Sequence, residues 1–248
     1  MWFRSRLVVI MFGLDRQMSE AGPNILVALG SEGGVMRPLV ADLSHEIPVV
    51  RVYSRTVPKQ SDSCIDIQSV EEIPSAISQL VPESPRIAFV GAAFKRQKDL
   101  FVSTDRSELH DMINTNITLY VDAMAVLLPI MIRERFGRIV YLSSFRAGSP
   151  VRGTTIYSAS KAFGETFFSA IGKEYGRFGI SSVSIRMGYF EGGMFDDYDE
   201  HARKNATQSV SMKRLGSQTD LAAAVRSCFA QPYLNSGVVE LNGGLNLG

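Results

Sequence analysis

The strongest constraint on the fold is an alternation, from Asn24 onward, of short apolar runs with longer stretches of helical periodicity. Seven runs, mostly rich in Val, Ile and Leu, predict buried strands at Ile25–Leu29, Val49–Tyr53, Ser63–Asp66, Ile87–Val90, Arg138–Leu142, Ser181–Ile185 and Gly237–Leu241. Five stretches between them predict helices at Val35–His45, Val70–Leu80, Leu109–Arg133, Tyr157–Phe178 and Asp220–Ala230. This alternation is typical of βαβ units. We expect an α/β fold with a doubly wound, Rossmann-type parallel sheet of about seven strands and helices on both faces.

The length of 248 residues suits a single domain of this kind, which we place at residues 24–248. Residues 1–23 are set apart as an N-terminal extension of uncertain structure. The apolar stretch Leu7–Leu14 follows two arginines, as in a secretory signal, but a charged pair comes next and there is no small-x-small cleavage site. We favour an ordered arm or a different translation start, because Met11 and Met18 each offer one.

The charge balance excludes some classes of partner. The chain carries 26 basic and 25 acidic side chains, a formal net charge of +1, which gives no argument for nucleic-acid binding. No window looks both long enough and apolar enough to span a bilayer. We therefore expect a cytoplasmic protein with neither a nucleic-acid nor a membrane partner.

Cysteine and histidine spacing argues against metal chemistry. Cys64 and Cys228 lie far apart and outside any Cys-x-x-Cys motif, which favours two buried reduced thiols. His45, His110 and His201 show no metal-binding spacing, and no Gly-x-Ser-x-Gly elbow accompanies them. The chemistry must therefore use other groups, and no metal is expected.

A glycine-rich turn joins the first predicted strand to the first helix. Gly30 and Gly34 lie in this turn, at the place where a dinucleotide-binding fold holds its pyrophosphate. Glycines allow the backbone to approach phosphates, and a helix N-terminus offers free N–H groups and partial positive charge. A turn of this composition is also found as a tight turn alone, so both interpretations stay open at this point.

The end of the second predicted strand favours one form of such a cofactor. Ser54, Arg55 and Thr56 stand where these folds contact the adenosine ribose. Arginine and hydroxyl groups suit the 2′-phosphate of NADP, whereas an acidic residue would suit the 2′-hydroxyl of NAD. NADP(H) is therefore expected over NAD(H), with a solvated Arg55 as the alternative.

The most informative constellation is a pair of serines followed by a tyrosine and a lysine. Ser143 and Ser144 end a strand, and Tyr157 and Lys161 lie four residues apart at the head of a helix, so they share one face. A phenol, with an ordinary pKa of about 10, is a poor acid–base group at neutral pH, and a nearby ammonium stabilises its anion. Such a pair on an exposed helix has only a minor effect, so the preceding serines matter to the argument.

These residues resemble the short-chain dehydrogenase/reductase family, in its classical type, and are similar to 3-oxoacyl-ACP reductase-like ketoreductases. The similarity runs from Asn24 to Gly248 and includes Asn116, Asp66 and the ending Glu240–Leu245. The resemblance implies that Ser144 hydrogen-bonds a substrate carbonyl and that Tyr157 donates the proton as hydride arrives from a nicotinamide.

Further roles are implied by the same resemblance. Lys161 would bind the nicotinamide ribose and tune Tyr157, and Asn116 would hold a water that links Lys161 to solvent. Asp66 would contact the adenine. The cofactor-binding set implied by the turn and the resemblance is Gly30, Gly34, Ser54, Arg55, Thr56, Asp66, Gly91, Tyr157, Lys161 and Gly188.

The chain departs from the family pattern at several cofactor contacts. The third glycine of the turn is Met36, and the Asn-Asn-Ala-Gly after the fourth strand is Gly91-Ala92-Ala93-Phe94. The family's Pro-Gly after the sixth strand is Met187-Gly188, and Gly192 replaces a threonine. We therefore keep two hypotheses: an active NADP(H)-dependent ketoreductase, and a cofactor-binding scaffold or regulatory subunit with little turnover.

Substrate and partner predictions rest on less. We expect a small-molecule or carrier-bound carbonyl substrate, with Arg146 and Arg152 either meeting an anionic group or lying in solvent. The segment Tyr189–Lys213 has the composition of a lid over the substrate. A wide apolar arc on the predicted helix Tyr157–Phe178 favours self-association as a homodimer or homotetramer, or burial under a loop.

Overall fold

The computed structural model describes residues 22–52, 63–97, 99–192 and 199–246. Its centre is a seven-stranded parallel sheet in the order β3-β2-β1-β4-β5-β6-β7. The strands are β1 (Ile25–Leu29), β2 (Val49–Val52), β3 (Cys64–Ile67), β4 (Ile87–Gly91), β5 (Gly137–Ser144), β6 (Ile180–Met187) and β7 (Val238–Leu241). All seven predicted strands and the parallel arrangement are confirmed. The strand order reverses between β1 and β4, so the chain is doubly wound.

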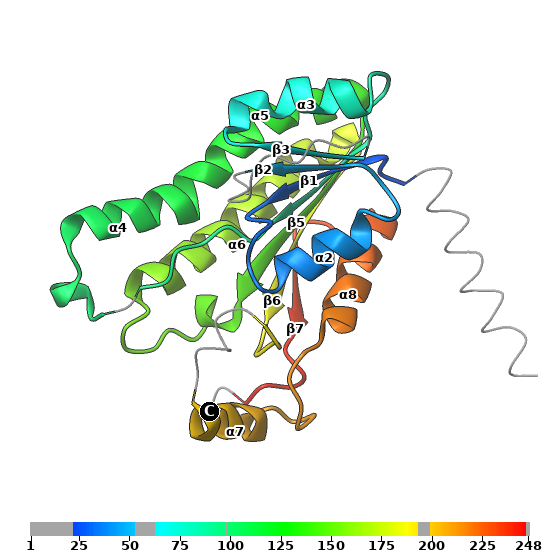
Figure 1. Cartoon of the computed structure of the whole chain (residues 1–248). Coiled ribbons are helices and arrows are strands. Elements are labelled where there is room, and N and C mark those ends of the chain that lie inside the picture. The colour runs from blue at the N-terminus through cyan, green and yellow to red at the C-terminus, as the bar shows by residue number, and fades with distance from the viewer. Residues whose placement is uncertain (1–21, 53–62, 98, 193–198, 247–248) are drawn as a thin grey trace, which may run out of the picture.

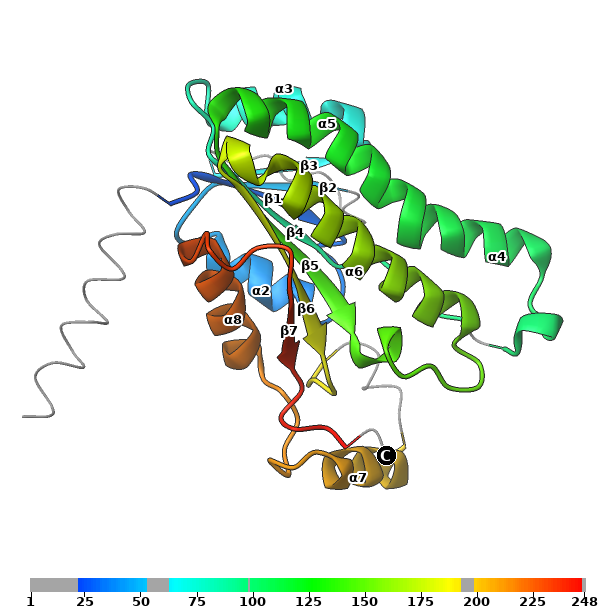
Figure 2. The ribbon, with the colours of Figure 1, turned by 180° about the vertical axis from the view of Figure 1, so that it is seen from behind.

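Helices cover both faces of the sheet (Figures 1 and 2). One face carries α2 (Met36–Leu43) and α8 (Gln218–Ala230), and the other carries α3 (Ile73–Leu80), α5 (Leu119–Glu134) and α6 (Thr155–Tyr175). The strands supply both cores because successive side chains point to opposite faces. On β1, Ile25, Val27 and Leu29 pack toward one helix layer, while Leu26 and Ala28 pack toward the other.

The helix before β5 is longer than predicted and is not uniform. It begins with α4 (Arg106–Ile113), passes through a π-helical segment at Asn114–Thr118 and continues as α5. By length and composition alone, the stretch Arg106–Glu134 is long and apolar enough to cross a membrane, so the expectation that no window has that length and hydropathy was wrong. A helix buried in the core of a soluble protein passes the same test. Its buried residues include Tyr120, Ala123, Met124, Leu127 and Met131, which belong to the core under α3, α5 and α6.

The segment after β6 contains a helix that the sequence did not predict. Within the region expected to be a lid, α7 (Glu200–Ser209) is capped at its N-terminus by Asp199, whose carboxylate accepts a hydrogen bond from the backbone N–H of Ala202 at 2.7 Å. The sequence did not predict α7 because the helix is mostly polar: Ala206 is its buried residue, so no apolar periodicity marks it. Backbone hydrogen bonds then join Ser211 and Met212 to the tail at Gly243–Gly244. Closure over a substrate stays a prediction.

Close packing of α6 on β5 brings the predicted catalytic residues together. At Gly164 of α6, an added Cβ would overlap the ring of Tyr141 on β5. That ring also stacks on Phe168 at 4.9 Å between centroids and meets Tyr120 edge-on at 5.2 Å. The absence of a side chain at Gly164 therefore allows the first half of α6 to lie against the end of β5.

We expect Gly164→Ala to lower the free energy of unfolding by about 1–3 kcal/mol, because overpacking forces Tyr141 or the helix to move. Helix propensity alone predicts the opposite sign, since alanine stabilises a helix interior by about 1 kcal/mol over glycine. Urea unfolding measures the change. Gly148→Ala is the control, because its Cβ would meet only the Arg186 guanidinium at an ordinary 3.6 Å. Equal stability of Gly164→Ala and the unsubstituted protein would contradict this account.

Candidate active site

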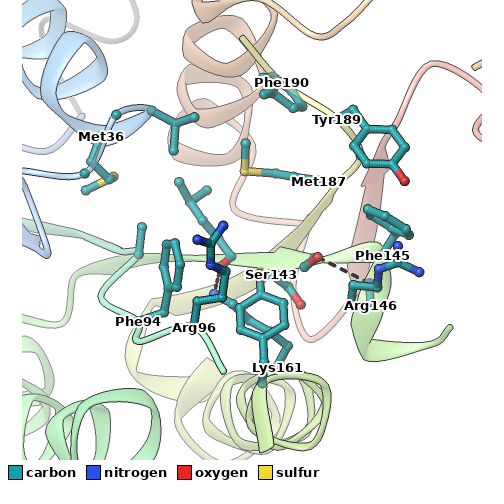
Figure 3. A pocket seen from close by; sticks show the side chains of 18 of the residues that line it. Met36, Phe94, Arg96, Ser143, Phe145, Arg146, Lys161, Met187, Tyr189 and Phe190 are labelled. Carbon is teal, nitrogen blue, oxygen red and sulfur yellow. Dashed lines mark hydrogen bonds between the residues drawn. The ribbon is translucent and has the colours of Figure 1, made fainter. Parts of the chain in front are cut away.

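A cavity of about 490 Å³ opens at the carboxyl ends of β5 and β6 (Figure 3). Loops that follow parallel strands meet at this edge, which is the usual ligand site of a doubly wound sheet. Its walls come from the glycine-rich turn, the loop after β4, the end of β5, the head of α6 and the loop after β6. They include Gly34, Met36, Phe94, Arg96, Ser144, Arg146, Tyr157, Lys161, Gly188, Tyr189 and Phe190.

A second cavity, of about 450 Å³, lies beside the first at the point where the strand order reverses. It is lined by Gly30 and Glu32 of the turn, by the loop after β4 and by Asn114 at the start of the π-helical segment. Gly33, Ala92 and Phe94 line both cavities, so the two adjoin at the turn and the loop after β4.

The glycine-rich turn has the form that an extended dinucleotide needs. Gly30 has a φ of +78°, and a Cβ there would lie 2.6 Å from the backbone of Ala93, so only glycine fits. The turn leads into α2, whose first turn holds no acidic side chain and whose N-terminus has no side-chain cap. Met36, in place of a third glycine, is fully buried in the core under α2. The turn could therefore hold a pyrophosphate at the N-terminus of α2.

The structure brings Ser144, Tyr157 and Lys161 to the wall of the large cavity. Ser144 ends β5, and Tyr157 and Lys161 lie one helical turn apart near the start of α6. The hydroxyl of Ser144 accepts a hydrogen bond from the backbone N–H of Arg146 at 3.3 Å. The neighbouring Ser143 donates its hydroxyl to Glu165 at 2.7 Å, so the two serines have different surroundings.

Lys161 carries a buried charge at the base of this site. Its Nζ donates to the backbone carbonyl of Leu142 at 2.8 Å and lies 4.9–5.9 Å from the ring centroids of Phe94, Tyr141 and Tyr157. Burial lowers the pKa of Lys161 from 10.5 to about 7, while the carboxylate of Glu165 acts in the opposite direction. The ammonium is therefore poised to change its charge near neutral pH.

Asn116 lies in the π-helical segment and braces the loop after β4. Its Oδ1 accepts from the backbone N–H of Lys95 at 2.6 Å, and its Nδ2 donates to the carbonyl of Lys95 at 3.0 Å and to Ser160 Oγ at 3.2 Å. The π-helical turn aims this amide inward, because the side chain is buried beside α6. A water held for Lys161 stays a prediction.

Phe94 is the residue of the site that sequence analysis underestimated. Its ring meets Tyr157 edge-on at 5.8 Å between centroids and lies 5.3 Å from Lys161 Nζ. In Figure 3 it lies on the side of the cavity nearer to Met36, away from Phe145 and Arg146. The loss of the family glycine at this position was visible in the sequence, but the direction of the ring was not.

Other predicted cofactor residues have mixed outcomes. Gly188 lines the large cavity, and a Cβ there would lie 2.8 Å from Asn242 Cα. Gly91 lines neither of these two cavities, and a Cβ there would lie 2.6 Å from the ring of Tyr120; its cofactor contact stays a prediction. The predicted ribose-binding residues Ser54, Arg55 and Thr56 lie outside the described residues.

Asp66 also lines neither described cavity, and its carboxylate has another partner. The side chain is fully buried, and its two oxygens accept from Nε and Nη2 of Arg51 on the adjacent strand, at 2.6 and 2.8 Å. A buried bidentate pair of this kind fixes the packing of β2 on β3. Asp66 thus pairs with Arg51 in the described structure, and its adenine contact stays a prediction.

We expect Asp66→Asn to destabilise the fold by about 3 kcal/mol, because it leaves the Arg51 guanidinium without its charge partner. The double variant Arg51→Met/Asp66→Leu should regain most of that stability, since an apolar pair removes both buried charges. Urea unfolding and titration with NADPH should be run on both variants. If the double variant regains stability but loses affinity for NADPH, that result would support the predicted contact between Asp66 and the adenine.

Comparison with known proteins agrees with this geometry. Residues 48–203 match the family model described as short chain dehydrogenase. The chain is 24% identical over 242 residues to 3-oxoacyl-[acyl-carrier-protein] reductase FabG of Pseudomonas aeruginosa, covering 96% of each chain. It is 27% identical over 187 residues to the human 3-oxoacyl-[acyl-carrier-protein] reductase, covering 75% of this chain and 77% of the human protein.

Its fold is similar to that of ElxO with NADP bound, with a TM-score of 0.78 and 18% identity, covering 90% of this chain and 98% of ElxO. The family model spans more than half of the chain and includes Ser144, Tyr157 and Lys161. The chain therefore belongs to the short-chain dehydrogenase family of oxidoreductases, as the spacing of these three residues predicted.

Proposed function

We propose that this protein is an NADP(H)-dependent oxidoreductase that interconverts a ketone and a secondary alcohol. The observation that carries the proposal is the convergence of Ser144, Tyr157 and Lys161 on one cavity beside the N-terminus of α2. The relatives named as 3-oxoacyl-[acyl-carrier-protein] reductases and the NADP-bound structural neighbour support the same chemistry. The bound nicotinamide would supply or accept the hydride.

The chain's own residues would manage the proton and the carbonyl. Ser144, held at the end of β5, donates to the substrate oxygen and fixes its orientation. Tyr157 gives its phenolic proton to that oxygen during reduction and takes it back during oxidation. The ammonium of Lys161, 5.9 Å from the centroid of the Tyr157 ring, stabilises negative charge on the phenolic oxygen. Phe145, Met187 and Phe190 limit access of water from the sides.

The substrate would be a small-molecule or carrier-bound carbonyl compound. Arg146 lines the cavity, with its guanidinium 4.4 Å from the centroid of the Phe145 ring, so it can meet an anionic group. Arg152 is exposed and is not part of the described cavity wall. For self-association as a homodimer or homotetramer, the stacked pair Phe163 and Phe167 on α6 supports the proposal, since both rings stay partly exposed.

Tyr157→Phe should lower turnover of acetoacetyl-CoA or ethyl acetoacetate by at least about 100-fold, because it removes the proton donor and little else. Binding of NADPH, followed by nucleotide fluorescence, should change little in this variant. Lys161→Ala should weaken that binding. Retained turnover in Tyr157→Phe would contradict the mechanism, and an unsubstituted protein that binds neither NADPH nor NADH would contradict the function.

A second candidate function, a scaffold or regulatory subunit with little turnover, is favoured by the position of Phe94. Its ring lines both cavities and lies beside Tyr157, the proposed proton donor, and Lys161, which would tune it. A ring that blocks the passage between the cavities would exclude an extended dinucleotide. The enzyme proposal instead requires the Phe94 ring to line the site and to leave room for a cofactor that extends from one cavity into the other.

We expect Phe94→Gly to change the affinity for NADPH by less than about tenfold, or about 1.4 kcal/mol, because the ring serves as a wall. Phe94→Ala separates the loss of the ring from added backbone freedom. Fluorescence titration of both variants against the unsubstituted protein measures the effect. A gain in affinity well beyond tenfold in both variants would show that Phe94 blocks the site, and the scaffold function would then be preferred.

A further inference from the structure

Behind Lys161 lies a buried charged cluster that the predicted catalytic set does not include. Glu165 follows Lys161 by one helical turn, and its side chain is only 10% exposed. One carboxylate oxygen accepts from Ser143 Oγ at 2.7 Å and from Arg186 Nε at 2.9 Å. The other accepts from Arg186 Nη2 at 2.5 Å. Burial of a carboxylate is costly, and these three hydrogen bonds offset that cost.

The cluster follows the register of the sheet. Ser143 on β5 is paired with Arg186 on β6, and Arg186 is paired with Glu240 on β7. Arg186 Nη1 donates to Glu240 at 2.6 Å, where the Glu240 side chain is nearly half exposed. A row of three polar residues thus crosses three neighbouring strands, with Glu165 of α6 over its inner end. Arg186 therefore balances one buried and one exposed carboxylate.

Glu165 is linked to the predicted catalytic residues indirectly, through its hydrogen bond to Ser143 on β5. Ser143, which it binds, lies between Leu142, whose carbonyl accepts from Lys161, and Ser144, which lines the cavity. A hydrogen bond to Ser143 therefore restrains the strand between these two neighbours. The carboxylate also acts on Lys161 across one helical turn, where side chains four residues apart are neighbours.

We propose that Glu165 is a positioning residue that acts through Lys161: held by Ser143 and Arg186, its carboxylate favours the charged form of the buried amine and restrains the strand end that carries Ser144. This inference rests on the proposed function for the role of Lys161 in binding and catalysis. The charge relation between Glu165 and Lys161 does not depend on it.

Other groups around Lys161 set the background against which Glu165 acts. Burial lowers the pKa of Lys161 to about 7, and Glu165 is the charged group that raises it. The rings of Tyr141 on β5 and Tyr157 on α6 face Lys161 Nζ, and Tyr120 on α5 packs on Tyr141. Among charged groups, Arg186 on β6 binds Glu165, and Arg96 in the loop after β4 and Arg146 in the loop after β5 line the same cavity as Lys161. Of these only the arginines are cationic near neutral pH, and they oppose the ammonium.

The test uses the dependence of folding stability on pH. The pKa of Lys161 is lower in the folded than in the unfolded chain, so between about pH 7 and 10.5 the unfolded state binds more protons. The stability contribution of Lys161 therefore rises as pH increases above its folded pKa, and it is lost as pH falls through that value. Urea unfolding from pH 5.5 to 9.5, with Lys161→Met subtracted in each background, isolates this titration.

Two variants of the cluster should move the titration in opposite directions. Glu165→Gln removes the carboxylate that favours the charged form of Lys161. The pH at the midpoint of the Lys161 titration should therefore fall by about one pH unit. Arg186→Gln removes the cation that balances Glu165, so the midpoint should rise by a similar amount. Glu240→Gln is the matched control: it removes the exposed carboxylate of the same arginine and should leave the midpoint unchanged. General damage to the fold would not produce opposite shifts.

Equal midpoints in all four proteins, or shifts of the same sign in Glu165→Gln and Arg186→Gln, would overturn the inference. NADPH titration over the same pH range tests the link between this titration and function. The affinity for NADPH should fall as Lys161 loses its proton. The pH of that fall should change among the variants in the same direction as the midpoint pH of the Lys161 titration. If no NADPH binds, the proposed function fails, while the unfolding midpoints still decide the role of Glu165.

Discussion

The buried ammonium of Lys161 is the charge on which the arrangement of the site depends. A cation removed from water is costly unless hydrogen bonds and opposite charge compensate it. Here the compensation comes from the carbonyl of Leu142, three aromatic rings and the carboxylate of Glu165. These partners come from three parts of the wall: the end of β5, the loop after β4 and α6. The cost of burying one charge therefore fixes the relative positions of these parts.

This arrangement requires α6 to lie close to β5. Gly164 lets the ring of Tyr141 fit under the helix, and the same ring forms part of the surroundings of Lys161. The aromatic cluster of Tyr120, Tyr141 and Phe168 then joins α5 to the contact, and the hydroxyl of Tyr120 donates to the carbonyl of Ala93 at 2.7 Å. Helix packing, the aromatic cluster and the loop that carries Phe94 are thus one connected structure.

The sequence predicted the sheet and the site residues that depend on local pattern. Buried parallel strands appear as apolar runs, and Tyr157 and Lys161 share a helix face by spacing alone. It could not predict contacts set by residues far apart in the chain. Asp66 faces Arg51 because two strands pair in register, and Gly91 is glycine because Tyr120 packs on it. The polar helix α7 carries too few apolar residues for periodicity to reveal it.

The two large side chains in place of family glycines show why sequence departures must be judged in three dimensions. Met36 and Phe94 both replace a glycine near the predicted cofactor, so the sequence gives them equal weight against binding. The core under α2 takes in Met36 completely, because the helix and β1 leave room for an apolar side chain there. Phe94 has no such core beneath it and turns toward Tyr157 and Lys161 instead. Met36 therefore packs into the core although it also lines the large cavity, whereas the Phe94 ring lines both cavities and lies against Tyr157 and Lys161. Phe94 is the change that bears more directly on the choice between an enzyme and a scaffold.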